Sequence, residues 1–255
     1  MNLYYLILYF IILVIIFTLR RRIIRDKDFK NIKIVDSTYP EFSFGGCSWG
    51  CLYYIGCIKA IYELNLDREC KVICCSSGCL MGIALLLKTD IETLINIYQE
   101  LTNDCLKYNS PMGRMTKWYK RAFERLIPND EVAKSLSKNL TIVYTKFPSM
   151  EYIRKNNFTD KNDLMKSCLA SSFIPFYFTE IVFDKNQLCL DGGFINNYPK
   201  LSSKTISIGV VKTNSNKKYP DIYNSNPVKV FGPTVSQDQE KVIQDGYDST
   251  ISYFN

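Results

Sequence analysis

Histidine is absent from the 255 residues of this chain. A Ser-His-Asp relay is therefore impossible, which excludes every hydrolase mechanism that depends on an imidazole base. Zinc sites that combine histidine with cysteine are excluded for the same reason. A site of four cysteines would need paired spacings, and no two cysteines are separated by two residues. We expect neither a metal ion nor an organic cofactor.

The ten cysteines are concentrated in one stretch, with seven of them between Cys47 and Cys79. They fall in segments that we predict to be buried strands and helices. Cys74 and Cys75 are adjacent, so their side chains point to opposite faces of a strand. We interpret the cysteines as small core residues in a reducing compartment rather than as a disulfide framework.

Positive charge is in excess by seven, and much of that excess lies in four arginines between residues 20 and 25. No zinc-finger spacing, array of basic helices or interleaving of aromatic and basic residues occurs, so we expect no nucleic-acid partner. A local cluster of arginines beside an apolar segment instead indicates a membrane surface that carries anionic lipid.

Residues 3–19, "LYYLILYFIILVIIFTL", contain no charged side chain. As a helix this segment would be about 26 Å long, which is at the short end for crossing a bilayer. A signal peptide starts with positive charge and ends in small residues, and this segment does neither. We therefore predict that residues 1–25 form an uncleaved transmembrane anchor with a basic flank, the alternative being a cleaved or buried segment. The arginines then place the rest of the chain in the cytoplasm.

Strand and helix patterns alternate beyond the charged linker at residues 26–31. We predict strands at 32–35, 41–44, 71–75, 140–144, 187–190 and 205–211, with a further short strand at 151–154. We predict helices at 52–63, 77–88, 90–101, 115–126, 161–171 and 236–254, the last weakened by Gly246, and a polar loop at 214–226. Such alternation is typical of one α/β domain, here residues 32–255, in which helices cover both faces of a mostly parallel sheet.

The stretch "VICCSSGCLMGIALLL" runs from an apolar strand through small residues into an apolar helix. A serine at such a sharp turn is exposed as a nucleophile in enzymes with the G-x-S-x-G motif. Here the motif has Ser76 at its centre and Gly78 at its end, while Cys74 replaces the first glycine. A plain turn with a helix cap is the alternative interpretation.

A base for this serine must be a carboxylate or a lysine, because histidine is absent. The best candidate is Asp191 in "LCLDGGFINNYP", where an apolar strand ends and Gly192 and Gly193 follow. Ser76 and Asp191 both follow strands, and the carboxyl ends of parallel strands meet at one crevice. The alternative is that the two glycines only mark a turn.

A glycine-rich loop, "SFGGCSWG", precedes both motifs. Acyl transfer creates an oxyanion that needs backbone N–H donors, and the amides of Gly46, Cys47 and Ser48 are the candidates. Such a loop could bind a phosphate group instead. The order of loop, serine and aspartate favours the first interpretation.

These segments together resemble the patatin-like phospholipase family, nearest to its adiponutrin-type animal branch. The loop with its following helix, the elbow, "ASSFIPFYF" and "LDGGFINNYP" all look like family motifs, over roughly residues 32–255. The resemblance implies a three-layer α/β/α domain and a Ser–Asp dyad. By position, Ser76 would be the nucleophile, Asp191 the base, and Gly46, Cys47 and Ser48 the oxyanion hole.

Three positions depart from the family pattern: Ser48 stands for the third loop glycine, Cys51 for the last, and Cys74 for the first elbow glycine. Backbone N–H groups survive these changes, but the backbone conformation is kept only if no left-handed φ is required.

We therefore expect a membrane-anchored lipid acyl hydrolase, of phospholipase A or acylglycerol lipase type, that acts on membrane lipid. Two alternatives stay open: a catalytically inactive patatin-like protein that binds lipid or a partner, and a lipid acyltransferase. The basic helix at 115–126, with Trp118 and Tyr119, could also touch the bilayer; the alternative is a solvated helix face.

Overall fold

The computed structural model describes residues 18, 23–24, 39–108, 110–210, 220–226 and 229–255. Most of the predicted anchor and the first predicted strand, at 32–35, lie outside these residues. Among the residues described, no helix is both long and apolar enough to cross a membrane. The transmembrane anchor therefore stays a prediction.

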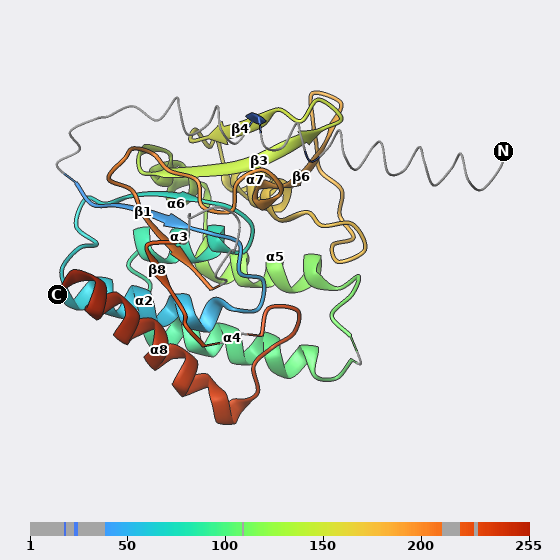
Figure 1. Ribbon diagram of the computed structural model, residues 1–255. Helices are drawn as coiled ribbons and strands as arrows, with labels where there is room; N and C mark the ends of the chain where they lie inside the picture. The colour runs from blue at the N-terminus through green and yellow to red at the C-terminus, as the bar shows by residue number, and fades with distance from the viewer. Residues whose placement is uncertain (1–17, 19–22, 25–38, 109, 211–219, 227–228) are drawn as a thin grey trace.

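An eight-stranded sheet forms the centre of the domain (Figure 1), in the order β5-β6-β3-β2-β1-β7-β8, with β4 paired to β3. Five strands run parallel to one another: β1 (Glu41–Phe44), β2 (Lys71–Cys74), β3 (Leu140–Phe147), β7 (Ile206–Gly209) and β8 (Ile222–Tyr223). The antiparallel strands are β4 (Tyr152–Lys155), β5 (Phe183–Asp184) and β6 (Gln187–Asp191). The expected α/β fold with a mostly parallel sheet is confirmed.

Helices follow the strands in the predicted alternation. They are α2 (Cys51–Glu63), α3 (Gly78–Leu86), α4 (Ile91–Cys105), α5 (Met115–Leu126), α6 (Asp130–Ser135), α7 (Lys161–Ser172) and α8 (Ser236–Phe254). Two short 3-10 turns, η1 (Leu136–Lys138) and η2 (Gly192–Phe194), complete the described elements. In Figure 1, α2, α4 and α8 lie together on one side of the sheet.

The two faces of the sheet are separated by the alternation of side chains along each strand. Phe42, Phe44 and Val72 are fully buried among the helices in the main core. Ile73 and Val143 point to the opposite face, where a small second cluster forms. The cysteines belong to this packing: all ten are free thiols and nine are buried, as predicted for core residues.

Helices α2 and α8 cross with their backbones in contact. A Cβ on Gly246 would lie 2.0 Å from the carbonyl oxygen of Tyr53, and a Cβ on Gly56 would lie 1.9 Å from that of Ile243. Neither position has room for a side chain, so the expectation that Gly246 only weakens the closing helix is incomplete. This glycine is required for the close approach of the two helices.

The short elements are where sequence pattern and structure differ. Helix α6 and strands β5 and β8 were not predicted, because elements of two to six residues are too short to show a period. Helix α4 also continues to Cys105, beyond the predicted end at residue 101. Part of the predicted loop at 214–226 lies outside the described residues, and its last part contains β8.

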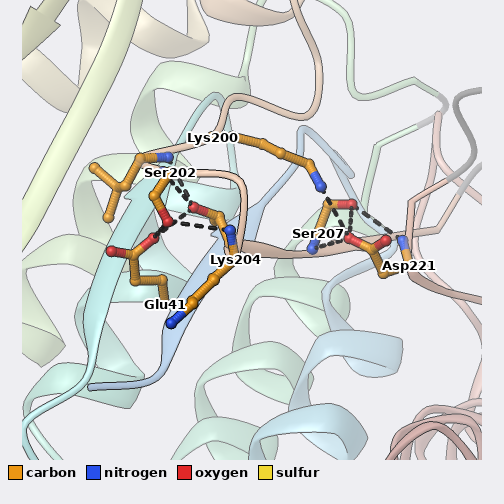
Figure 2. Close-up of polar contacts among 8 residues, drawn as sticks. Glu41, Lys200, Ser202, Lys204, Ser207 and Asp221 are labelled. Carbon is orange, nitrogen blue, oxygen red and sulfur yellow. Dashed lines mark hydrogen bonds and ion pairs between the residues drawn. The ribbon is translucent and has the colours of Figure 1, made fainter. Parts of the chain in front are cut away.

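Polar contacts at the amino end of the sheet anchor the segment that follows the DGG motif (Figure 2). The buried carboxylate of Glu41, at the start of β1, accepts hydrogen bonds from the hydroxyls of Ser202 (2.6 Å) and Thr205 (2.7 Å). Asp221 likewise accepts from the N–H (2.8 Å) and hydroxyl (2.7 Å) of Ser207. These bonds hold β7 and β8 in register with β1.

Helix α5 does not offer its aromatic side chains to a bilayer. Trp118 is 1% exposed and Tyr119 is 3% exposed, so both belong to the core. The exposed face carries Arg121 and Arg125, which pair with Glu100 of α4. The predicted bilayer contact of this helix is wrong, because its amphipathic face is covered by the protein itself.

Candidate active site

Ser76 occupies the turn between β2 and α3 with a left-handed backbone, φ +56°. For a residue other than glycine this conformation costs about 1–2 kcal/mol. Four hydrogen bonds hold it. The Ser76 N–H donates to the carbonyl (3.1 Å) and hydroxyl (2.9 Å) oxygens of Ser171, and the Ser76 carbonyl accepts from the Cys79 N–H (3.0 Å) and the Tyr119 hydroxyl (3.3 Å). The strained serine predicted from the motif is therefore present, at the point where strand becomes helix.

The glycine at the end of the elbow motif is a steric requirement. A Cβ on Gly78 would lie 2.4 Å from the carbonyl oxygen of Gly45 and 2.5 Å from that of Phe44. Cys74, which replaces the first motif glycine, is an ordinary buried residue of β2 and is not left-handed. Its side chain fits beside Gly82, so this departure from the family pattern introduces no backbone strain.

Asp191 ends β6 and is 6% exposed. Its Oδ1 accepts a hydrogen bond from the Gly193 N–H at 2.7 Å. Gly192 has no room for a side chain, since a Cβ there would lie 2.4 Å from the Val143 carbonyl oxygen. The DGG motif is thus more than a turn signal: it packs the carboxylate against the sheet and supplies it with one amide donor.

Burial raises the pKa of the Asp191 carboxyl from its ordinary 3.8 to about 7. Hydrogen bonds from the Ser76 hydroxyl and the Gly193 amide favour the charged form, but they offset the burial only in part. Ser76 and Asp191 line the same cavity. A carboxylate whose pKa lies near neutrality is suited to accept and return a proton.

The glycine-rich loop lies directly against this serine. A Cβ on Gly46 would be 3.0 Å from Ser76 Cβ and 3.4 Å from Ser76 Oγ. Ser48, which stands for the third family glycine, has φ +48°, so here the left-handed conformation is kept at a cost in strain. Its hydroxyl is hydrogen-bonded to that of Tyr177 at 3.0 Å.

The three predicted oxyanion donors are not equivalent in this structure. The Gly46 N–H donates to Oδ1 of Asn197 at 2.9 Å, and the Cys47 N–H donates to Oγ of Ser77 at 3.1 Å. The Ser48 N–H has no acceptor among the residues described. An oxyanion would bind Ser48 first, and the other two amides would have to exchange their present acceptors.

Asn197, Ser77 and Ser171 are site residues that the motifs did not identify. Asn197 also donates to the Gly46 carbonyl oxygen at 3.5 Å, so its amide group bonds both backbone polar groups of this loop residue. The only signal in the sequence was its place downstream of DGG. Ser77 sits inside the elbow motif, and Ser171 sits in the "ASSFIPFYF" segment, but neither pattern states a partner.

A cavity of about 280 Å³ opens at this site. Its lining includes both candidate dyad residues and all three predicted oxyanion residues, whereas Cys74, Gly78 and Gly192 do not line it. The full lining is Gly46, Cys47, Ser48, Ser76, Ile174, Asp191, Gly193, Phe194, Asn197, Val230 and Phe231. The cavity is mostly apolar, with its polar groups gathered around the serine, as expected for a site that binds an acyl ester.

Comparison with known proteins gives a consistent result. The family model described as patatin-like phospholipase matches residues 42–201. The chain is 23% identical over 173 residues to the human 1-acylglycerol-3-phosphate O-acyltransferase PNPLA3, covering 65% of this chain and 36% of that protein. It is 27% identical over 180 residues to human patatin-like phospholipase domain-containing protein 4, covering 66% of this chain and 70% of that protein. The chain thus spans only 36% of the length of PNPLA3.

Among solved structures, VipD from Legionella pneumophila has a similar fold, with a TM-score of 0.53 and 11% identity. The similarity covers 87% of this chain and 69% of that one, and it bears on the fold alone. It supports the three-layer α/β patatin fold. Because the family model matches well over half of the chain, the chain belongs to the patatin-like phospholipase family.

Proposed function

We propose that the chain is a lipid acyl hydrolase, of phospholipase A or acylglycerol lipase type, in which Ser76 is the nucleophile and Asp191 the base. Membership of the family supports a lipid hydrolase or acyltransferase activity at the coarser level. The observation that carries the finer proposal is a serine hydroxyl beside a buried carboxyl group of raised pKa, both facing one apolar cavity.

The reaction proceeds in two halves. Asp191 accepts the hydroxyl proton of Ser76 while Oγ attacks the acyl carbonyl carbon, and the proton then passes to the departing alcohol oxygen. In the second half, Asp191 takes a proton from water, whose oxygen attacks the acyl-enzyme. The fatty acid leaves, and Ser76 regains its proton.

Stabilisation of the tetrahedral oxyanion falls to the loop amides. The Ser48 N–H is available without rearrangement, while the Gly46 N–H must leave Asn197. Each donor of this kind typically lowers the activation barrier by about 3–4 kcal/mol. The pair of occupied amides is also the one observation that favours the alternative of a lipid-binding protein without turnover.

A fluorophosphonate probe separates these two functions, because it reacts with an activated serine only. We expect the full chain to be labelled, Ser76→Ala to be unlabelled, and Asp191→Asn to be labelled very slowly. The exposed Ser149 provides a matched control, and Ser149→Ala should label like the wild type. Equal labelling of Ser76→Ala and the wild type, or no labelling of the wild type, would reject the hydrolase.

Acyl transfer differs from hydrolysis only in the acceptor, since an alcohol replaces water in the second half. The name of PNPLA3 motivates this candidate. Incubation with a glycerolipid labelled in its acyl chain, with and without an acylglycerol acceptor, distinguishes the two. Free fatty acid is the expected main product, and a labelled glyceride formed at its expense would establish transfer.

We also propose that residues 1–25 anchor a patatin-like domain of residues 32–255 to a membrane, with the domain on the cytoplasmic side. The uncharged segment at 3–19 and the arginines that follow it support this assignment. The chain should resist extraction from membranes at alkaline pH, and protease added outside sealed cells should not reach the domain. Release at alkaline pH would contradict the anchor.

A further inference from the structure

Two aromatic side chains stand almost fully out of the domain on separate loops. Phe176 is 85% exposed and Phe231 is 77% exposed, more than any other large apolar side chain that the structure describes. They lie on residues 173–178 and 229–235, which we call the rim loops. Large aromatic groups left in water at this extent usually mark an interaction surface.

Each rim loop is hydrogen-bonded to one of two adjacent residues of the glycine-rich loop, Ser48 or Trp49. The Ser48 hydroxyl bonds to the Tyr177 hydroxyl at 3.0 Å, and the Trp49 N–H donates to the Val230 carbonyl at 3.2 Å. Each loop also contributes to the cavity wall, through Ile174 and Phe231. The exposed rings therefore flank the opening of the cavity that contains Ser76.

The exposure of Phe176 is a built feature rather than the result of a loose loop. Its backbone is left-handed, with φ +68°, and its carbonyl oxygen accepts a hydrogen bond from the Gly113 N–H at 2.9 Å. The N–H groups of Tyr177 and Phe178 both donate to the Ile174 carbonyl. A strained backbone that holds an aromatic ring in solvent is the kind of outlier from which a function is inferred.

Apolar and cationic residues occur in or next to the segments that carry and hold these rings. Met112, next to Gly113, is 50% exposed. The guanidinium of Arg114 lies 4.3 Å from the centre of the Tyr108 ring and forms no ion pair with any described residue. Lys229, exposed beside the Phe231 loop, has no described ion pair either. Aromatic tips beside unpaired cations suit the interface of a membrane with anionic headgroups.

We propose that Met112, Phe176 and Phe231 form a surface that inserts into the headgroup region of a phospholipid bilayer and opens the cavity toward it. A bilayer fits better than a protein partner because the exposed rings stand on two loops that both line the cavity, and cations without a described ion pair lie in or next to these loops. The purpose of the surface rests on the proposed lipid acyl hydrolase, but the docking itself does not require turnover. This docking surface takes the place of the bilayer contact that was first expected from α5, whose aromatic rings are buried.

Tryptophan substitution with brominated lipids tests the docking in the full chain. Phe176→Trp and Phe231→Trp are reconstituted in vesicles of phosphatidylcholine and phosphatidylserine with brominated acyl chains, which quench only tryptophan at membrane depth. The native Trp49 and Trp118 are 4% and 1% exposed and give a constant background. Tyr253→Trp is the control. Helix α8 ends at the left of Figure 1, whereas β1, which leads into the glycine-rich loop, points to the right.

We expect the added emission at 176 and 231 to be quenched at least twofold, and that at 253 to be unchanged. Quenching at 176 no greater than at 253 would overturn the proposal, whether or not a protein partner binds there. Because this readout needs no catalysis, quenching without fluorophosphonate labelling would reject the hydrolase and leave the docking surface intact.

A second variant connects the surface to turnover. Phe176→Asn removes the ring, and asparagine tolerates the left-handed backbone better than most residues do. Loss of one inserted phenylalanine should lower the rate on vesicle substrate about tenfold. The rate on a soluble short-chain ester should not change, because Phe176 does not line the cavity. Equal losses on both substrates, or no loss on vesicles, would contradict the proposal.

Discussion

Asp191→Asn should abolish the reaction and at the same time stabilise the folded chain. Burial raises the pKa of this carboxyl from 3.8 to about 7, so the ionised form is disfavoured by folding. At about 1.4 kcal/mol per pKa unit, the charge lowers the free energy of unfolding by about 4 kcal/mol at a pH where the carboxyl is ionised in both the folded and the unfolded chain. Asparagine is nearly isosteric, keeps an oxygen for the Gly193 N–H, and carries no charge, so about 4 kcal/mol is the upper limit of the gain.

The gain in stability of Asp191→Asn should increase with pH. Because the folded pKa lies above the unfolded one, the folded state binds the extra proton between about pH 4 and pH 7. The stability of the wild type is therefore greatest below the unfolded pKa and falls as pH rises through this window. The asparagine variant has no carboxyl to ionise at this position. Its free energy of unfolding should therefore exceed that of the wild type by about 2 kcal/mol at pH 5 and about 4 kcal/mol at pH 8.

Thermal unfolding of both full chains in the same nonionic detergent, at four values from pH 5 to pH 8, measures the difference. For a domain of this size, about 4 kcal/mol corresponds to a rise in Tm of roughly 8–16 °C. The exposed Asp248 provides a control, and Asp248→Asn should change stability by no more than about 0.5 kcal/mol at any pH. An asparagine variant at position 191 that is less stable than the wild type at pH 8, or a gain that does not vary with pH, would refute the reasoning.

Three further outcomes follow from the same site. For the wild type, kcat/KM on a soluble ester should rise about tenfold from pH 6 to pH 8 as Asp191 ionises, and a profile flat from pH 5 to pH 9 would exclude this base. Asn197→Ala removes the side chain that fixes Gly46 through both its N–H and its carbonyl oxygen. The loss of loop position should outweigh the loss of a competing acceptor and lower kcat about tenfold with little change in KM; an unchanged or raised kcat would contradict a positioning role for Asn197. Gly78→Ala places a methyl group 2.4 Å from a carbonyl oxygen and should lose more than about 2 kcal/mol of stability in urea unfolding. Gly232→Ala, with open space around it, is the matched control and should lose far less.

The part of the candidate site whose backbone conformation was predicted correctly depends on local order. The turn at Ser76 follows from a strand, small residues and a helix that are consecutive in the chain. Asp191 was placed beside it by the rule that parallel strands end at one crevice, and that reason is wrong, because β6 runs antiparallel to β3 and therefore to β2. The register brings them level instead, since Asp191 pairs with Tyr144 of β3 and Cys74 pairs with Ile142 of the same strand. The alternation of strands and helices, which is also local order, predicted the sheet.

The sequence did not predict contacts between segments that lie far apart in the chain. Nothing near Gly46 or Cys47 in the chain indicates that Asn197 and Ser77 accept their amide hydrogens. The aromatic residues of α5 read as a membrane face because amphipathic helices look alike whether protein or lipid covers them. Phe176 was part of a recognised motif, yet its exposure comes from a backbone held by Gly113.

For this chain, then, composition and local pattern limited the residue types that could do the chemistry: with no histidine, the base for a serine must be a carboxylate or a lysine. The three-dimensional packing determined the pKa of the Asp191 carboxyl and the hydrogen-bond partners of the loop amides. Burial at 6% exposure moved the Asp191 pKa toward neutrality, and contacts between distant segments chose which loop amides have acceptors. The physical reason is that residue identity and short-range order are carried by the chain itself, whereas desolvation and hydrogen-bond partners exist only after distant segments have met.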